Sequence, residues 1–457
     1  MKVTLVFPAR ENEPIAAAIR TPPAGATLLA ALVPDDVDVS VVDMLGGDHI
    51  DFDEATDLVG ITVRTPRAAI AYEIADRFRD QGTTVVLGGP HASAVPLDAA
   101  EHADAVVVGE AETTWPRLLA DLKVGGLKPF YVCGPLRFDP GSRPVYHEPE
   151  LPPLTGLPLA RRDLVPHERY TMDTLITTRG CPYDCSFCPV PDLFGRKLRH
   201  RPIDEVVAEV DTLRPVYFNL DDNVFGVPGA EQYYLDLFGE LAKLDPARAW
   251  TGQAGLGVVE RSEGREVLRR AVECGLNTIS IGIESVSQAG LTESRAWKKL
   301  STSGKNPSLD KTREQIRIVQ DLGVFVVGWF VLGWDSDGPD AYQRSLDFAD
   351  ETGMAPVIVN LLPLPGTRCY DEMRAAGRMK PGLTWNDFGF EGGGIVYSHP
   401  VMSEQEMVTA CRQAAQDGYT HERMRRRSLA LARQRGEPQA SAIAMMAQRG
   451  LKQAFGG

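Results

Sequence analysis

Short apolar runs alternate with longer amphipathic stretches through the first third of the chain. The apolar runs predict strands at residues 2–7, 37–42, 58–63, 84–87 and 105–108. The amphipathic stretches between them predict helices at residues 24–32, 68–79 and 112–122. Strands that alternate with helices are typical of a parallel sheet with helices on both faces. We therefore expect a doubly wound α/β domain over residues 1–128.

Five parallel strands suit the flavodoxin-like (Rossmann-like) fold, in which ligands bind at the carboxyl ends of the strands. Four loops follow predicted strands at that edge, at residues 8–14, 62–67, 88–91 and 109–112. Gly88 and Gly89 come straight after a strand, where glycine lets the backbone approach a ligand closely. These loops are therefore the candidate binding site of the first domain.

A second alternation of strands and helices follows a proline-rich stretch at residues 129–170, which we expect to be an extended linker. Strands are predicted at residues 174–178, 216–220, 250–254, 277–281, 323–332 and 356–361. Helices are predicted between them at residues 203–213, 230–244, 263–274, 310–322 and 340–352. Six parallel strands indicate a partial (β/α)6 barrel over residues 171–370, with its chemistry at the carboxyl ends of the strands.

Residues 371–457 predict a small, mainly helical C-terminal region. Trp385 and Tyr397 lie near a glycine-rich turn, and we expect such aromatics either to belong to the core or to roof a substrate pocket. The end of the region carries eight Lys and Arg residues against two Glu residues, which predicts either a solvated basic helix or a basic patch for an acidic partner or a membrane surface.

Three cysteines, Cys181, Cys185 and Cys188, stand on one short loop that follows the first barrel strand. A 4Fe-4S cluster takes four ligands, so three thiolates would leave one iron open to a small molecule. Zinc sites usually pair two cysteine units, but the other four cysteines are scattered singly. An odd number of cysteines also argues against a disulfide framework. The spacing therefore favours a reactive iron–sulfur cluster.

With the aromatic Phe187 before the last cysteine, this loop resembles the signature of the radical S-adenosylmethionine (SAM) enzymes. The resemblance implies that the open iron chelates SAM, and that reductive cleavage of SAM yields a 5'-deoxyadenosyl radical. Beside Phe187, it implies a SAM site with these members: Asp221, Asp222 and Asn223 after the second barrel strand, Glu284 and Ser285 after the fourth, and Pro365 after the sixth. In the family, the residue at Glu284 binds the ribose hydroxyls.

The N-terminal loops resemble the cobalamin-binding domain that is fused to many radical SAM enzymes, through Gly-Gly-Pro-His and Val-Gly-Glu-Ala-Glu. The implied cobalamin contacts are Arg10, Thr62, Arg64, Thr65, Gly88, Gly89, Pro90, His91, Gly109 and Glu110. The Asp-x-His-x-x-Gly motif that supplies a histidine to cobalt is missing. We therefore expect cobalamin without that ligand, or a degenerate domain that no longer binds it.

Composition and charge argue against several classes of protein. A net charge of −14 argues against general nucleic-acid binding, which needs a basic surface. The longest apolar run, residues 324–332, is far shorter than the ~20 residues of a membrane span. The first residues lack the apolar core of a signal peptide. Free cysteines and an oxygen-sensitive cluster favour a reducing cytoplasm.

The resemblance implies a cobalamin-dependent radical SAM enzyme. Our main hypothesis is radical methylation: one SAM methylates cobalamin, a second yields the radical that abstracts a substrate hydrogen, and the carbon radical takes the methyl group. The alternatives are a cyclase, ring-contracting or rearranging enzyme with the same cofactors, and a non-catalytic iron–sulfur or cobalamin sensor. We expect a flavodoxin- or ferredoxin-type electron donor and a small-molecule, lipid or peptide natural-product substrate.

Overall fold

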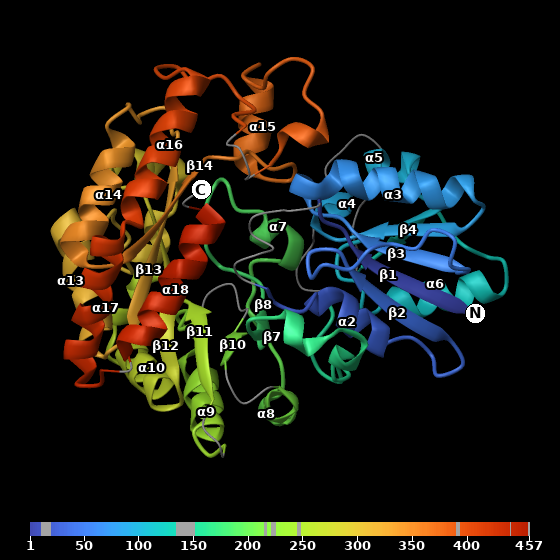
Figure 1. The fold of residues 1–457 in the computed structure, drawn as a ribbon, viewed down its shortest axis with the longest axis horizontal. Helices are drawn as coiled ribbons and strands as arrows, with labels where there is room; N and C mark the ends of the chain where they lie inside the picture. The colour runs from blue at the N-terminus through green and yellow to red at the C-terminus, as the bar shows by residue number, and fades with distance from the viewer. Residues whose placement is uncertain are drawn as a thin grey trace.

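The computed structural model describes residues 1–10, 20–133, 151–213, 217–220, 225–244, 248–389, 394–438 and 440–455. Two parallel sheets of six strands each form the two lobes of the molecule, and helices cover both sheets (Figure 1). The first sheet is built from the N-terminal third of the chain and the second from the middle. This arrangement confirms the predicted α/β class with a flavodoxin-like domain followed by a partial barrel.

The N-terminal sheet has the strand order β2-β1-β3-β4-β5-β6, all parallel. Its strands are β1 (Lys2–Phe7), β2 (Asp38–Asp43), β3 (Leu58–Thr62), β4 (Thr84–Gly88), β5 (Ala105–Val108) and β6 (Phe130–Val132). The first five strands have the flavodoxin-like order. The sixth was not predicted and lies within the expected linker. Because the order reverses between β1 and β3, the loops after these two strands diverge and leave room for a ligand.

Both faces of the N-terminal sheet are buried. Val3 and Leu5 pack with α2 (Ala24–Ala31) and α6 (Trp115–Lys123) on one face. Val6 and Val59 pack on the other face with α3 (Ala68–Asp80), which lies beside the short helices α4 (Pro90–Ala94) and α5 (Pro96–Glu101). Side chains of successive strand residues point to opposite faces, so an apolar run can fill both cores at once.

The second sheet has the order β14-β13-β12-β11-β10-β7, with every neighbouring pair parallel. Its strands are β7 (Asp173–Leu175), β10 (Tyr217–Leu220), β11 (Ala249–Gln253), β12 (Leu276–Glu284), β13 (Phe325–Leu332) and β14 (Ala355–Asn360). The connecting helices are α8 (Ile203–Thr212), α9 (Glu231–Leu241), α10 (Ser262–Glu273), α13 (Leu309–Asp321) and α14 (Ala341–Thr352). The predicted strand at residues 174–178 is divided: it ends at Leu175, and Thr178 begins a separate strand.

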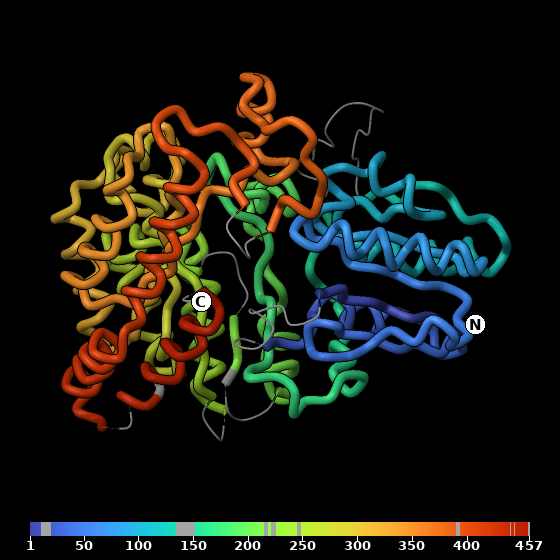
Figure 2. The backbone as a smooth tube through the Cα atoms, turned by 45° about the horizontal axis from the view of Figure 1, so that its top comes forward, coloured from blue at the N-terminus to red at the C-terminus, as the bar shows by residue number. Residues whose placement is uncertain are grey.

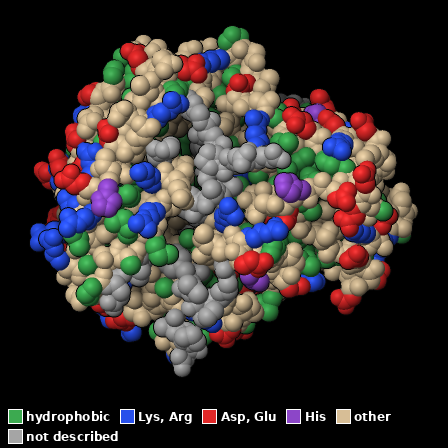
Figure 3. Space-filling view, viewed as in Figure 1, with side chains coloured by type: hydrophobic (Ala, Val, Ile, Leu, Met, Phe, Trp, Pro, Cys, Tyr) green, Lys and Arg blue, Asp and Glu red, His purple; other side chains and the backbone are tan. Residues whose placement is uncertain are grey.

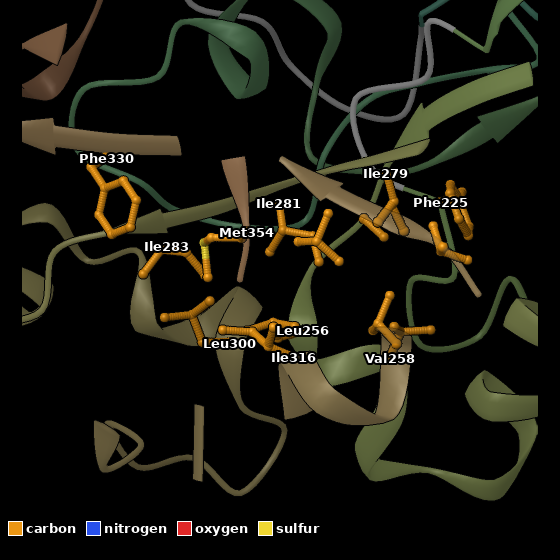
Figure 4. Close-up of a cluster of buried hydrophobic side chains, with 14 of the residues drawn as sticks. Phe225, Leu256, Val258, Ile279, Ile281, Ile283, Leu300, Ile316, Phe330 and Met354 are labelled. Carbon is orange, nitrogen blue, oxygen red and sulfur yellow. The ribbon is translucent and has the colours of Figure 1, made fainter. Parts of the chain in front are cut away.

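The core of the barrel lies between the sheet and its helices. Ile279, Ile281 and Ile283 of β12 point to the same side, toward Leu256 and Leu300 (Figure 4). Since strand residues alternate between faces, Ser280 and Gly282 lie on the opposite face of β12 from these isoleucines. The hydrophobic alternation of β12 thus sets which side chains can reach the barrel mouth.

Three helices follow the barrel: α16 (Glu404–Gly418), α17 (His421–Arg435) and α18 (Ala440–Phe455). They lie over the outer strands of the barrel sheet (Figure 2), where Met424 and Leu431 pack with Phe325 and Val357. The segment before them includes α15 (Arg368–Ala375) and the short helix η5 (Trp385–Asp387), which contacts the N-terminal domain at α3 and η1 (Thr65–Arg67).

The prediction of a solvated basic tail was wrong for Arg427 of α17, while Arg425, Arg426 and Arg433 of the same helix are exposed. Arg427 is buried there with no exposed side-chain area, and its guanidinium lies 3.0 Å from Asp350 of α14. Arg423 and Arg426 reach the same carboxylate, at 2.7 and 2.8 Å. One acidic residue on a neighbouring helix therefore accounts for three of the tail arginines, which composition alone could not reveal.

The face of the molecule in Figure 3 shows Lys and Arg side chains interspersed with Asp and Glu side chains over both lobes. None of the helices in the described ranges combines the length and the apolar character that a membrane crossing needs.

We expect Asp350→Ala to loosen α17 against the barrel, because it leaves the buried Arg427 guanidinium without its carboxylate. Removal of one partner from a buried ion pair costs about 3 kcal/mol or more. Hydrogen exchange should show the amides of α17 opening more easily by about that amount. Asp347→Ala is the matched control, since Asp347 is an exposed residue of the same helix. Equal exchange in the two variants would contradict a structural role for the pair.

Candidate functional site

The three cysteines lie on a loop closed at its base by two short strands, β8 (Thr178–Arg179) and β9 (Arg199–His200), which pair antiparallel. Gly180 opens the loop at φ +100°, and a Cβ there would lie 2.2 Å from the carbonyl oxygen of Lys197. Only glycine fits such a turn without strain. The Cys181 amide donates to the Gly195 carbonyl oxygen at 3.1 Å, which draws the two sides of the loop together.

The interior of the loop suits a metal cluster. All seven cysteines of the chain are free thiols. Burial raises the pKa of Cys185 to about 12 and that of Cys188 to about 11, while the nearby Lys299 ammonium acts in the opposite direction on both. Thiols held protonated in this way bind metal only by releasing protons.

Three free thiols on one loop are the ligand type that a 4Fe-4S cluster takes. Across the part of the chain that the structure describes, no three or more His, Cys, Asp and Glu side chains are grouped to hold one metal ion. In a 4Fe-4S cluster each cysteine binds a different iron, so the three sulfur atoms need not meet at one point.

Glu284 lies at the end of β12 in a left-handed conformation, with φ +65°, next to a register shift between Gly282 and Glu284. A non-glycine residue in this region is uncommon and marks a site held by its surroundings. The carboxylate is 4% exposed and pairs with Lys299 of the short helix α12 (Trp297–Leu300). Leu300, buried in the core of Figure 4, anchors that helix.

The Lys299 ammonium pairs with Glu284 and also acts electrostatically on Cys185 and Cys188. Its burial acts to lower the pKa, but the charges of Glu284 and Cys185 act more strongly together, and the pKa of Lys299 is raised. The ammonium is therefore a permanent positive charge beside the thiols. Sequence reasoning missed Lys299, because a lysine in a short Trp-Lys-Lys-Leu segment has no signal that separates it from a solvated one.

The structure brings several of the other predicted SAM residues to the same region. The centroid of the Phe187 ring lies 5.9 Å from that of Trp334, the second residue after β13. Pro365 lies in the turn between β14 and α15. The first turn of α15 contacts the cysteine loop, because the Cys369 amide donates to the Ser186 carbonyl oxygen at 2.8 Å. Asp221, Asp222 and Asn223 lie outside the described residues.

Ser285 has a local structural contact. Its hydroxyl oxygen accepts a hydrogen bond from the Ser287 amide at 3.0 Å, and the side chain is 2% exposed. This bond holds the chain just before α11 (Gln288–Ser294). Ser285 thus makes a local contact with its own loop, whereas the Glu284 carboxylate pairs with Lys299 and acts electrostatically on Cys185.

The predicted cobalamin residues gather at the carboxyl edge of the N-terminal sheet. Thr62 ends β3 and Gly88 ends β4, and the others stand in the loops after β1 (Arg10), β3 (Arg64, Thr65), β4 (Gly89, Pro90, His91) and β5 (Gly109, Glu110). Packing explains part of this set: Gly89 has φ +93°, and a Cβ there would lie 3.0 Å from the Val63 carbonyl oxygen. The glycine lets the loops after two neighbouring strands lie against each other.

His91 is directed into the protein rather than toward solvent. Its side chain has no exposed area, and Nδ1 lies 3.1 Å from the Thr65 hydroxyl. Its ring packs edge-on against Trp385 at 4.5 Å, and the Trp385 indole donates to Asp98 at 2.9 Å. Burial lowers the pKa of His91. Trp385 therefore contacts the N-terminal domain, whereas the other aromatic of the predicted pocket roof, Tyr397, belongs to the barrel core.

Glu110 lies at the junction of the two domains. Arg179 and Arg199, from the base of the cysteine loop, both bind its carboxylate. Its side chain is 1% exposed. Sequence reasoning assigned Glu110 to cobalamin and did not single out the two arginines, because the pairing joins positions that lie about 70 and 90 residues apart.

Comparison with known proteins supports the same two domains. The profile of the Radical SAM superfamily matches residues 175–349, and the profile of the B12 binding domain matches residues 15–119. The bacteriochlorophyllide d C-12(1)-methyltransferase of Chlorobaculum tepidum is 29% identical over 363 residues, which cover 77% of this chain and 74% of the relative. The hopanoid C-2 methylase of Rhodopseudomonas palustris is 27% identical, over 78% of this chain and 65% of the relative.

Two solved structures share the fold. The cobalamin-dependent SAM radical enzyme OxsB, with aqua-cobalamin and SAM bound, superposes with a TM-score of 0.70 at 19% identity, over 90% of this chain and 66% of OxsB. The radical SAM methyltransferase TsrM of Kitasatospora setae, with cobalamin and a 4Fe-4S cluster bound, gives a TM-score of 0.66 at 17% identity, over 92% of this chain and 88% of TsrM. With both domain profiles in one chain and a cysteine loop of the required form, the protein belongs to the cobalamin-dependent radical SAM enzymes.

Proposed function

We propose that this enzyme transfers a methyl group derived from SAM to an unactivated carbon atom of its substrate. The observation that carries the proposal is the contact between the two cofactor regions. Arg179, one residue before the turn into the cysteine loop, lies 2.9 Å from Glu110 in a loop at the carboxyl edge of the N-terminal sheet. A cluster held by the cysteines and a cobalamin held at that edge would face a shared space.

The relatives support methyl transfer over rearrangement. The two described above are a methyltransferase and a methylase by name, and each covers more than three quarters of this chain. One acts on a bacteriochlorophyllide and the other on a hopanoid, so the reaction is shared while the substrates differ. The substrate class proposed here stays broad: a small molecule, a lipid or a peptide natural product.

The roles proposed for the barrel residues follow from their positions. Cys181, Cys185 and Cys188 would hold three irons of a cluster and leave the fourth open for the amino and carboxylate groups of SAM. Glu284 would accept hydrogen bonds from the ribose hydroxyls of SAM. Lys299 would hold the Glu284 carboxylate in place and stabilise the negative charge of the thiolates.

The N-terminal residues would bind cobalamin through the loops that follow β1, β3, β4 and β5. Arg64, Thr62 and Gly109 are the proposed direct contacts among them. His91 and Thr65 would shape the loops from beneath, since they are bonded to each other inside the domain. No histidine from this edge is therefore proposed as a ligand to cobalt.

When bound, the cluster supplies an electron to SAM and cobalamin carries the methyl group. The overall reaction consumes two SAM molecules and two electrons for each substrate. It releases S-adenosylhomocysteine, methionine and 5'-deoxyadenosine, and the substrate exchanges one hydrogen for the methyl group. We propose that an external flavodoxin- or ferredoxin-type protein in the cytoplasm supplies the electrons, and that nucleic acid is not a partner.

The proposal is tested with anaerobically reconstituted enzyme, hydroxocobalamin and SAM that carries a deuterated methyl group. We expect bound cobalt, deuterated methylcobalamin with S-adenosylhomocysteine, and 5'-deoxyadenosine after reduction. Bound cobalt and deoxyadenosine without methyl transfer would favour the cyclase or rearrangement alternative. A cluster without cobalt would overturn the proposal through a degenerate N-terminal domain. Absence of deoxyadenosine would favour a sensor.

Replacement of any one of Cys181, Cys185 and Cys188 by Ala should abolish both the cluster absorbance and 5'-deoxyadenosine formation, because two thiolates cannot hold the cluster. Cobalamin binding should persist, since it belongs to the other domain. Cys274→Ala is the control: Cys274 is buried in the barrel core, where its thiol contacts the Ala271 carbonyl oxygen. Iron content and the visible spectrum report the result. An intact cluster in a loop variant would contradict the assignment.

Glu284→Gln should weaken SAM binding by about tenfold or more, because it removes charge-assisted hydrogen bonds worth about 1.5–3 kcal/mol. It also leaves Lys299 buried without its carboxylate, so stability should fall as well. The double variant Glu284→Gln with Lys299→Met separates the two effects. We expect its thermal stability to recover while SAM binding, measured by equilibrium dialysis, stays weak. Recovery of both would mean that Glu284 acts only on the fold.

A further inference from the structure

Four charged side chains meet where the N-terminal domain contacts the base of the cysteine loop: Glu110, Glu112, Arg179 and Arg199. We call them the Glu110 cluster. Arg179 Nη1 lies 2.9 Å and Arg199 Nη1 3.1 Å from the same Glu110 oxygen, Oε2. Arg199 also binds Oε1 of Glu110, and Arg179 binds Glu112. The Glu110 side chain is 1% exposed and the other three are 11–12% exposed, so the cluster is almost dry.

The two arginines occupy equivalent places at the base of the loop. Arg179 and Arg199 stand directly opposite each other in the β8–β9 pair, so they bracket residues 180–198 with all three cysteines. Arg199 Nη1 also donates to the Pro152 carbonyl oxygen at 2.7 Å, and the Arg179 guanidinium lies 5.7 Å from the Phe194 ring. Both guanidinium groups therefore have contacts that do not depend on Glu110.

Glu110 is held equally firmly on its own domain. It follows Gly109, which has φ +85° at the end of β5 and donates to the Ser93 hydroxyl of α4 at 2.9 Å. Its carboxylate has two oxygens, and the two guanidinium groups occupy both of them. With its lone pairs used in this way, the side chain has little capacity left to bind a cofactor.

The chemistry of the Glu110 cluster suits a role in orienting the two domains better than a role in stabilising the fold. Buried ion pairs pay a large desolvation cost, and apolar residues of similar volume often stabilise a protein as well. Guanidinium and carboxylate groups differ from apolar ones in direction, because a bidentate pair has one preferred geometry. A contact of this kind fixes the distance and angle between two surfaces. Reactions that need two partners lose about a hundredfold in rate for a misplacement of 1 Å.

We propose that Glu110 is a positioning residue that holds the cysteine loop in register with the cobalamin domain, and that it is not a contact of cobalamin. The role of Glu110 in methyl transfer rests on the proposed function, whereas its contact with Arg179 and Arg199 is independent of that function. Through Arg179 and Arg199, Glu110 holds the base of the cysteine loop against the carboxyl edge of the N-terminal sheet, and it would thereby orient a cluster bound by the three cysteines toward that edge. Methyl transfer depends on that orientation, whereas binding of each cofactor alone does not.

Glu110→Gln tests the proposal, with Glu209→Gln as the matched control. Glu209 is also buried and also binds two arginines, Arg162 at 2.5 Å and Arg201 at 2.6 Å, but it lies on α8 within the barrel. Both variants replace a buried carboxylate by its neutral isostere. Hydrogen exchange of the cluster-loaded enzyme is the first measurement, since it needs no cobalamin. We expect β8 and β9 to exchange about tenfold faster in Glu110→Gln, through loss of charge-assisted bonds, and less so in Glu209→Gln.

The second measurement is the magnetic interaction between bound cob(II)alamin and the reduced cluster, recorded by electron paramagnetic resonance. In Glu110→Gln we expect full cobalt and iron content with a broader distribution of distances between the two centres. Glu209→Gln should keep the wild-type distribution. Loss of cobalamin from Glu110→Gln with unchanged hairpin exchange would overturn the proposal and restore Glu110 as a cobalamin contact. Equal effects in both variants would also overturn it. If the wild type binds no cobalt, the proposed function fails, while hairpin exchange still decides the role of Glu110.

Discussion

The loop that carries the three cysteines can serve one cluster only if both of its ends and its tip are held in place. The β8–β9 pair closes the base, and Gly180 allows the tight turn. At the tip, the Ser186 amide donates to the Ser294 carbonyl oxygen at 2.9 Å, and the Cys369 amide donates to the Ser186 carbonyl oxygen. These bonds come from α11 and α15, which follow different barrel strands, so the position of the thiols depends on the whole barrel.

Paired buried charges set the electrostatics around that loop. Lys299 of α12 is held by Glu284 at the end of β12, and Arg179 and Arg199 are held by Glu110 at the domain junction. An isolated charge would be too costly at such burial, so each positive group has a carboxylate within reach. The chain has a net charge of −14, yet Lys299 acts to lower the pKa of all three cysteine thiols, against the larger effect of burial, which raises it. Local pairing, not overall charge, determines the environment of the site.

The sequence predicts the strands well because each one is an apolar run that fills a core, as the observed β1 and β5 at the predicted bounds show. The cysteine loop was predictable because its signal is local. Lys299, Arg199 and the buried Arg427 were not, since their roles depend on carboxylates distant in sequence. Composition placed Arg427 in solvent, and packing of α17 against the barrel buried it. Pairing between elements is a property of the fold that no single segment contains.

The C-terminal region adds further contacts between the barrel and the N-terminal domain. Trp385 binds Asp98 and packs on His91, and Arg10 binds Asn386. On the barrel side, a Cβ at Gly366 would lie 3.1 Å from that of Ala94 in α4. Together with the Glu110 cluster, these contacts join the two domains at separate points. Because rotation about one contact would break another, these separate contacts together hold the two domains in one relative orientation.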